Sequence, residues 1–339
     1  MPMLTEYTSF ADAQTHCSKE GLWELFDGDR AAINIAHECI ERHPRDRVAV
    51  RIALAAGGSE SYTYGEISDW SGRYANFLRE QGIAPGERVA LMVEPSLHFY
   101  IALYGAIKAG CVAVPMFTLF GPDALRLRVG DCDPKFLLLA PEKADLAANA
   151  GCNTAIANDD FMAMLENYDT AFELTTAGRD MAMYQYTSGT TRELPDAVKH
   201  RHQSIVTVML AALYGTGTRP GDNFMCPSST AWGHGLWHGT LSPHAMGITT
   251  ASYAGKFDPD RLMAALEEFE ISNLSAAATH YRMMKNAGTA RDYTFKLDKV
   301  SFTGEPMDTD TAEWAKETFG QYPASFYGTT EVGVLLGSY

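Results

Sequence analysis

Hydrophobic residues along the chain follow two alternating spacings, one typical of helices and the other of buried strands. Between Thr63 and Gly82 apolar residues recur every three or four positions, which predicts a helix with one buried face. Thr63 and Glu66 have the spacing of a capping box, and Gly82 suits a left-handed stop at the C-terminal end. The recurring apolar residues are Ile67, Trp70, Tyr74 and Leu78.

Strands and helices are predicted to alternate along the rest of the chain. The predicted strands are 88–93, 111–115, 135–140, 181–186, 223–226, 273–277, 299–302 and 324–327. The predicted helices are 96–109, 204–213, one that starts at Asp258 and Pro259, one that starts at Thr279, and 309–319. This alternation is typical of mostly parallel β-sheets flanked by helices, so we predict an α/β fold. The sequence offers one weak candidate for a domain boundary, the polar stretch 158–180.

Composition and charge narrow the class of protein. The 339 residues are 46% hydrophobic and 20% charged, which fits a globular chain rather than a disordered one. The net charge of -15 makes nucleic acid and anionic membrane surfaces poor partners. The first ten residues do not resemble a signal peptide, and Lys108, Gly110 and Pro115 interrupt the most apolar stretch, 99–117, so we predict no membrane span. Six scattered cysteines favour a reduced, cytoplasmic setting.

Two hydroxyl-rich segments, each placed after a predicted strand, carry the chemistry. The segment Tyr186–Thr191 reads YTSGTT, and a loop of this kind can wrap an anion with its hydroxyls and backbone amides. The segment Tyr327–Glu331 reads YGTTE; Thr330 could donate to a phosphate, and Glu331 could hold a magnesium ion. Taken singly, the first segment could be an ordinary Ser/Thr turn and the second a helix cap.

Taken together and in this order, the two segments resemble the adenylate-forming enzymes, which include acyl- and aryl-CoA synthetases, adenylation domains and luciferase-type ligases. The first segment matches the phosphate loop of that family and the second its Tyr-Gly-x-Thr-Glu motif. Supporting matches are 257–259, 277–282 and 304–306. The resemblance implies two pseudo-related subdomains of parallel sheet and helices, and a large domain over 47–339 that follows an N-terminal arm over 1–46. It also implies that the family's small C-terminal domain, with its adenylation lysine, has no counterpart here.

The family's chemistry assigns a role to each matched residue. A carboxylic acid attacks the α-phosphate of ATP to give an acyl-adenylate and pyrophosphate, and the thiol of coenzyme A then displaces AMP. By resemblance, Thr330 would contact the α-phosphate, Glu331 would bind magnesium and Tyr327 would stack on adenine. The remaining nucleotide contacts would come from Thr187, Ser188, Gly189, Thr190, Thr191, Arg192, Gly304, Glu305, Pro306, Gly328 and Thr329. Of these, Thr190 is predicted to act in catalysis together with Thr330 and Glu331.

The acid itself is predicted to lie beside His234, whose imidazole could orient the incoming carboxylate. Trp232, Gly233 and Ala278 are the nearest substrate candidates, and the aromatic and alanine residues around them suggest a compact pocket for a medium-chain, cyclic or aromatic acid. The aromatic and alanine residues could equally be plain core: Trp237, Tyr281, Met283, Ala276 and Ala277. The spacing of His234 and His238 could serve a metal or be purely structural. His200 and His202 are predicted to lie on a solvated turn.

The sequence departs from the family pattern after Thr191. Asp196 stands where the family carries a phosphate-binding lysine, so Arg192 or Lys199 would have to compensate. An unchanged Michaelis constant for ATP in Arg192→Ala would remove Arg192 from this role. Two readings remain: an AMP-forming acid–CoA ligase weakened by truncation, or an incomplete module that binds ATP or acyl-adenylate and needs a partner chain. An adenylation domain that loads a carrier protein is a further alternative.

Overall fold

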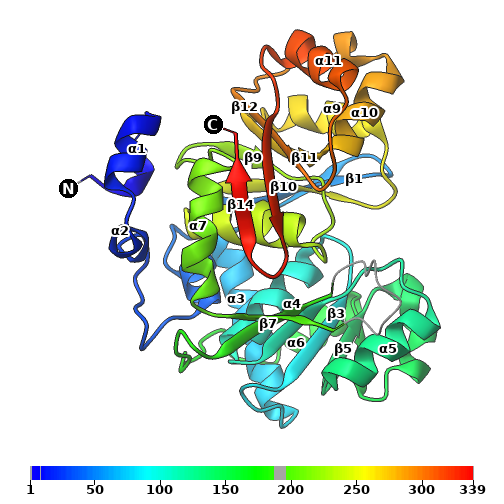
Figure 1. The fold of residues 1–339 in the computed structure, drawn as a ribbon. Coiled ribbons are helices and arrows are strands. Elements are labelled where there is room, and N and C mark those ends of the chain that lie inside the picture. Colours follow the sequence, from blue (N-terminus) through cyan, green and yellow to red (C-terminus); the bar gives the residue numbers. More distant parts are fainter. Residues whose placement is uncertain (1, 8, 187–195, 339) are drawn as a thin grey trace.

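Two β-sheets form the body of the molecule, one above the other in Figure 1. The computed structural model describes residues 2–7, 9–186 and 196–338. The lower sheet has the strand order β6-β5-β3-β4-β7-β8. Its strands are β3 (Arg88–Met92), β4 (Val112–Pro115), β5 (Phe136–Leu139), β6 (Asn153–Ile156), β7 (Met181–Gln185) and β8 (Val198–Arg201).

The upper sheet has the order β14-β13-β12-β11-β9-β10-β1-β2. Its strands are β1 (Val48–Leu54), β2 (Ser59–Thr63), β9 (Asn223–Met225), β10 (Thr249–Ala254), β11 (Asn273–Ala277), β12 (Lys299–Thr303), β13 (Ala324–Thr329) and β14 (Gly333–Gly337). Within the described residues, only the pairs β1–β2, β7–β8 and β13–β14 are antiparallel, and each lies at a sheet edge. The predicted α/β fold with mostly parallel sheets is therefore confirmed.

Helices cover the two sheets. They are α1 (Phe10–His16), α2 (Lys19–Trp23), α3 (Tyr64–Glu80), α4 (Leu97–Lys108), α5 (Pro122–Cys132), α6 (Asp159–Leu165), α7 (Ser204–Tyr214), α8 (Ser242–Ala245), α9 (Pro259–Glu268), α10 (Ala278–Ala287) and α11 (Thr309–Phe319). Shorter 3-10 helices are η1 (Leu4–Glu6), η3 (Pro141–Asn149) and η5 (Ala290–Asp292), and two π-helices are η2 (His37–Glu41) and η4 (His234–Leu241).

The local signals in the sequence place several helices correctly. The capping box of α3 forms: Glu66 N–H donates to Thr63 Oγ1 at 3.1 Å, and Thr63 N–H donates to Glu66 Oε2 at 2.7 Å. Gly82 follows the helix with φ 75°. The most apolar stretch folds as the buried helix α4 followed by the buried strand β4. Among the described residues, no helix combines the length and apolar character needed to span a membrane.

Other elements have no clear signal in the sequence. The strands β1, β2, β6, β8, β10 and β14 were not predicted, because they lack a continuous apolar run or carry polar residues on an edge. Strand β8 reads Val-Lys-His-Arg and forms because β7 pairs with it, Gln185 opposite Val198. Tertiary pairing therefore decides the four edge strands, β2, β6, β8 and β14, and also the interior strands β1 and β10.

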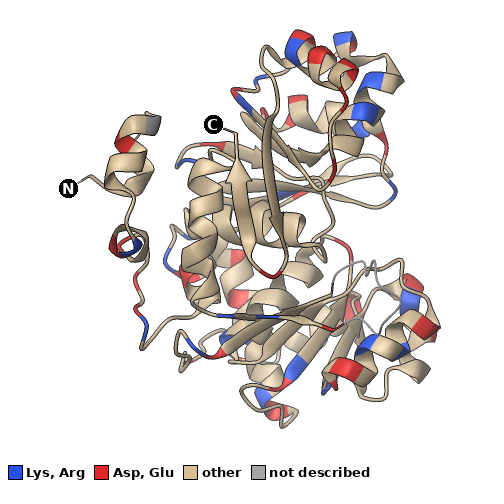
Figure 2. Ribbon diagram, viewed as in Figure 1, with Lys and Arg blue, Asp and Glu red and all other residues tan. Residues whose placement is uncertain are grey.

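The charged residues lie mainly on the outer helices. Figure 2 shows few of them on α7 and on the β13–β14 hairpin, which lie side by side near the middle of the molecule. Helix α7 contains no charged residue. In the N-terminal segment, Ile35 and Ile40 are fully buried in the main core cluster, so the last part of residues 1–46 packs within the body. The neutral region around α7 is where the site lies.

Candidate functional site

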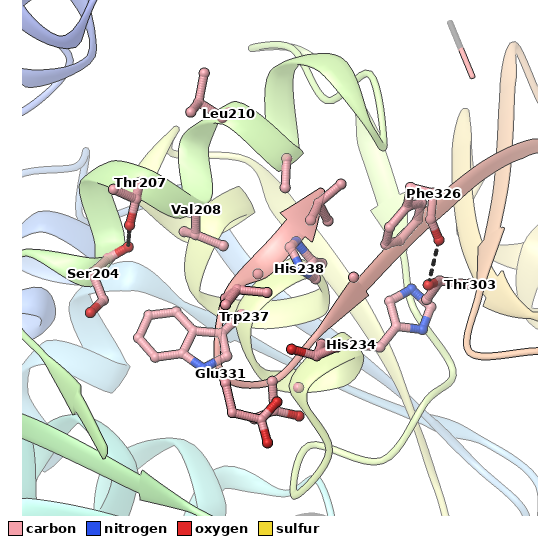
Figure 3. Close-up of a pocket in the computed structure, with 18 of the residues that line it drawn as sticks. Ser204, Thr207, Val208, Leu210, His234, Trp237, His238, Thr303, Phe326 and Glu331 are labelled. Carbon is pink, nitrogen blue, oxygen red and sulfur yellow. Dashed lines mark hydrogen bonds between the residues drawn. The ribbon is translucent and has the colours of Figure 1, made fainter. Parts of the chain in front are cut away.

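A cavity of about 530 Å³ opens between α7, the π-helix η4, the end of β12 and the β13–β14 hairpin (Figure 3). Its lining brings together eight residues that the sequence analysis singled out: Trp232, Gly233, His234, Gly304, Gly328, Thr329, Thr330 and Glu331. These residues come from three segments that are up to 99 positions apart in the chain. Their convergence was predicted from motifs alone.

The Thr330–Glu331 pair lies at the tip of the hairpin between β13 and β14. These strands are antiparallel, so the alternative that the Thr-Thr-Glu sequence caps a helix is wrong. The hairpin bends sharply at Gly328, where a methyl group would lie 2.0 Å from the carbonyl oxygen of Gly333. The turn holds the Thr330 hydroxyl half-buried and leaves the Glu331 carboxylate exposed at the cavity.

The end of β7 lies close to Gly233 and Thr330. A methyl group on Gly233 would lie 3.6 Å from Thr330 Oγ1 and 3.7 Å from Gln185 Oε1, so the two side chains share one point of the cavity wall. Gln185 Oε1 is buried and has no hydrogen-bond partner among the described residues. Gln185 directly precedes the first hydroxyl-rich segment, residues 186–191. The structure thus brings the entrance of that segment beside Thr330.

On another side of the cavity, Trp232 packs closely against the backbone of Gly304. The φ of Gly304 is 94°, which L-residues rarely adopt, and a Cβ there would lie 2.6 Å from Trp232 Cη2. The indole of Trp232 packs in turn edge-on to His234, with ring centroids 5.4 Å apart. A glycine at position 304 therefore lets the Trp232 ring lie flat against the backbone after β12.

His234 is buried in the wall and both of its ring nitrogens are engaged. Nδ1 lies 3.0 Å from the hydroxyl of Ser228 and Nε2 lies 2.9 Å from that of Ser275, which itself bonds Ser301 at 3.0 Å. Burial lowers the pKa of His234 well below its ordinary value, so the ring is neutral. The His234 ring therefore faces the cavity with its carbon surface. Both of its nitrogens are hydrogen-bonded to buried serine hydroxyls.

The helix η4 forms despite three glycines in and around it, Gly233, Gly235 and Gly239, a residue type that disfavours helices. A methyl group on Gly235 would lie 2.2 Å from the carbonyl oxygen of Ser229, so glycine is needed for the close approach of this helix to the preceding loop. Figure 3 shows Trp237 and His238, from the same helix, directed to the cavity. Burial lowers the pKa of His238 to about 4, and it is neutral as well.

His200 and His202 do not lie on a solvated turn, so that prediction is wrong. His202 is fully buried, and its Nδ1 accepts a hydrogen bond from the Ile35 N–H at 3.2 Å. His200 is half-buried on β8 and lines the cavity, with its ring 4.8 Å from that of Trp237. The β7–β8 pairing turns this polar segment inward, which no local pattern indicates.

Several predicted residues lie outside the cavity lining. Tyr327 is 61% exposed, and Pro306 is exposed. Glu305 is exposed and accepts a hydrogen bond from Thr279. Ala278 is fully buried at the start of α10. Their predicted contacts with nucleotide or acid remain predictions.

Three further pocket candidates, Tyr281, Met283 and Trp237, lie in different places. Tyr281 is fully buried in the second core cluster and donates its hydroxyl to the carbonyl oxygen of Ser301 at 2.9 Å, so the core alternative is correct for it. Met283 is 37% exposed and does not line the cavity. Trp237 does line it.

Residues 187–191 of the first hydroxyl-rich segment lie outside the described residues, and so does Arg192. The predicted roles of Thr187, Ser188, Gly189, Thr190, Thr191 and Arg192 therefore remain predictions. Asp196 is described and is exposed just before β8. Lys199, the second candidate for compensating it, lies with its ammonium group 5.1 Å from the Tyr184 ring centroid.

Within the described residues, the cavity lining offers a magnesium ion one carboxylate, that of Glu331. Glu331 makes no hydrogen bond or ion pair with any described residue, and its charge acts on His200. The described residues contain no group of three or more His, Cys, Asp or Glu side chains that could hold a metal. This donor set fits magnesium, which usually takes one or two protein carboxylates and completes its shell with phosphates and water.

Sequence reasoning missed the residues of α7 that line the cavity, Ser204, Thr207, Val208, Leu210 and Ala211. Their helix was predicted, but nothing in its apolar sequence distinguishes a cavity wall from ordinary core. Phe326, one position before the second motif, was also missed. Its ring lies 5.6 Å from the rings of both His234 and His238.

Comparisons with known proteins identify the family of the chain. The sequence model of the family described as AMP-binding enzyme matches residues 36–339. The chain is 26% identical over 326 residues to an acetyl-coenzyme A synthetase of Bacillus subtilis (strain 168), covering 90% of this chain and 57% of that protein. It is 27% identical over 280 residues to a 3-hydroxybenzoate–CoA ligase of Aromatoleum sp. (strain CIB), covering 78% and 53%. The chain thus spans slightly more than half the length of these relatives.

Solved structures show the same fold. An acyl-CoA synthetase of Brucella canis superposes with a TM-score of 0.92 at 24% identity, over 98% of this chain and 64% of that one. An anthranilate CoA ligase in complex with anthranoyl-AMP superposes with a TM-score of 0.84 at 18% identity, over 92% and 62%.

Proposed function

The chain belongs to the family of AMP-binding enzymes, and from this premise we propose that it takes part in the ATP-dependent activation of a carboxylic acid. One oxygen of the acid attacks the α-phosphorus of ATP, the bond to the β-phosphate breaks, and pyrophosphate leaves. The thiol of coenzyme A, or of another acceptor, then attacks the acyl carbon of the adenylate and releases AMP. The named activities of the relatives support this reaction class.

One observation carries the proposal: Thr330, Glu331 and Gly233 line one cavity, and Gln185 at the end of β7 lies beside Gly233. The Thr330 hydroxyl would donate to a phosphate oxygen, where a positioned donor stabilises the charge that develops during the transfer. Glu331 would hold magnesium, which neutralises phosphate charge when bound. Trp232 and the neutral His234 would form the wall against the acid, with Gly304 keeping the wall flat. ATP, magnesium and coenzyme A are thus the proposed cofactors and co-substrates.

The partner is a small carboxylic acid, and the neutral surroundings of the cavity favour a mainly apolar one. The scattered spacing of the six cysteines fits a reducing compartment, so we place the protein in the cytoplasm.

A second candidate is a module that binds ATP or acyl-adenylate without completing the reaction. Asp196 favours it, because an exposed carboxylate stands where related phosphate loops carry a lysine.

Acid-dependent exchange of labelled pyrophosphate into ATP separates the two candidates. With the 339-residue chain and a panel of carboxylic acids, we expect exchange that requires both magnesium and acid. Thr330→Val and Glu331→Gln should each lower its rate by a factor of about 10². Glu142→Gln, a matched change at an exposed position of η3, should leave it unchanged. Tight binding of ATP without any exchange would favour the module, and no binding of ATP or of an acyl-adenylate analogue would refute both.

A further inference from the structure

The cavity is nearly free of formal charge. Glu331 is the single Asp, Glu, Lys or Arg among its lining residues in the described part of the chain. The three histidines of the lining stay neutral, because burial lowers the pKa of His200 and His238 to about 4 and that of His234 well below its ordinary value. A second carboxylate or an ammonium group on the acid would therefore lose its hydration without gaining a counter-ion.

Several polar atoms of the lining already have partners. Thr303 donates its hydroxyl to the carbonyl oxygen of Phe326 at 2.7 Å, and Thr207 donates to that of Ser204 at 2.9 Å, as the dashed lines in Figure 3 show. The Ser204 hydroxyl accepts from the Arg201 N–H at 3.2 Å. The two nitrogens of His234 are taken by serine hydroxyls.

Three side chains of the lining, His200, Trp237 and His238, have a buried ring nitrogen without a partner among the described residues. The charge of Glu331 acts on His200, and Trp237 packs on that ring. His238 instead lies beside Phe326. The His238 side chain lies in the cavity wall and the residue is 8% exposed, yet neither ring nitrogen has a hydrogen-bond partner among the described residues. Nδ1 is fully enclosed, whereas Nε2 is not, so Nε2 is the atom that a bound molecule can reach. A bound molecule that covered Nε2 without pairing with it would lose about 1–3 kcal/mol, so a ligand that brings a hydrogen-bond partner for this atom is favoured.

The position of His238 says which part of the ligand it would meet. Its ring is 6.4 Å from that of His234, one helical turn away from the Thr330 end of the cavity, and 5.6 Å from Phe326. Carbon atoms of the acid would lie on Phe326, and a polar atom would have to be carried on the tail rather than on the reacting carboxylate. A neutral imidazole presents either an N–H or a lone pair at Nε2, and a hydroxyl group can pair with both.

We propose that this site selects a monocarboxylic acid whose otherwise apolar tail carries one neutral hydroxyl group, and that His238 is the specificity-determining residue that recognises it. The inference rests on the proposed function, since it names the substrate class of that same cavity.

Binding of non-reactive acyl-adenylate analogues, in which a sulfamate replaces the phosphate, tests the inference without requiring turnover. The probes are benzoyl and pentanoyl analogues, each with and without a hydroxyl at successive positions, and calorimetry gives their Kd values. We expect at least one hydroxylated probe to bind about tenfold more tightly than its parent. His238→Phe should erase that preference to within about twofold, and His238→Met, a second apolar replacement, should do the same. His16→Phe, a matched change at an exposed position of α1, should retain it.

The outcomes separate the inference from the function on which it rests. If the parent probes bind but no hydroxylated probe is preferred, the proposed function stands and the inference is wrong. The assignment to His238 is also overturned if the preference survives in His238→Phe, or if His200→Phe abolishes it instead. Probes with a second carboxylate or an ammonium group should bind at least tenfold more weakly than their parents, and equal binding contradicts the argument from neutrality. If no probe binds at all, the proposed function itself fails.

Discussion

Mild acid should destabilise this protein strongly, because several histidines are folded into neutral environments. His202, His238 and His244 are each buried, and burial lowers their pKa values to about 4, about 4 and about 3 from an ordinary 6.5. In the unfolded chain they take up protons below pH 6.5, whereas in the folded protein they do not until pH 4 or below. The stability that this difference contributes is complete above pH 6.5 and is lost as the pH falls.

The size of the effect follows from these values. At pH 5.5 an unfolded histidine is about nine-tenths protonated and its folded counterpart hardly at all, which costs about 1.4 kcal/mol for each residue and about 4 kcal/mol for the three. A protein of ordinary stability, about 5–15 kcal/mol, would lose a large part of it. The carboxyl groups of Glu41 and Asp308, with pKa values of about 2, do not titrate in this range.

Urea denaturation at pH 7.5 and pH 5.5 measures the loss. His238→Gln should reduce the difference between the two pH values by about 1.4 kcal/mol, the contribution of one buried imidazole. His16→Ala removes an exposed histidine and should leave the difference unchanged. Equal free energies of unfolding at the two pH values would show that these histidines are not held neutral by the fold, and the argument for a neutral cavity would lose its support.

Three further substitutions test the packing that supports the site. Gly304→Ala forces a left-handed backbone on a side chain that would lie 2.6 Å from Trp232, so we expect a loss of about 1–2 kcal/mol in stability and weaker binding of acyl-adenylate analogues; an unchanged thermal midpoint would contradict this. Glu41→Gln leaves the buried Lys108, now paired at 2.7 Å, without its counter-ion, and should cost about 3 kcal/mol in urea denaturation, a cost that adding Lys108→Met should largely remove. Thr63→Ala removes the cap of α3 and should cost about 1 kcal/mol by the same measurement, and no loss would show that the capping box contributes nothing.

Local patterns in the sequence were sufficient for most of the central elements. The capping box at Thr63, the Asp258 cap with Pro259, and the apolar runs of the central strands depend on residues close together in the chain, so they can be identified without a partner element. The two motifs around Thr187 and Thr330 could be identified for a similar reason, since the residue types at fixed spacing match a known family. The predicted convergence rests on that resemblance, and the described part, Thr330 beside the end of β7, fits it.

The sequence by itself therefore determined the helix caps, the central parallel strands and the motif that carries Thr330 and Glu331. Only the tertiary structure decided the edge strands, the inward position of His200 and His202, and the role of α7 as a cavity wall. These depend on pairing and burial between segments far apart in the chain. A lone histidine is as compatible with solvent as with a core, and the fold of its neighbours settles which environment it has.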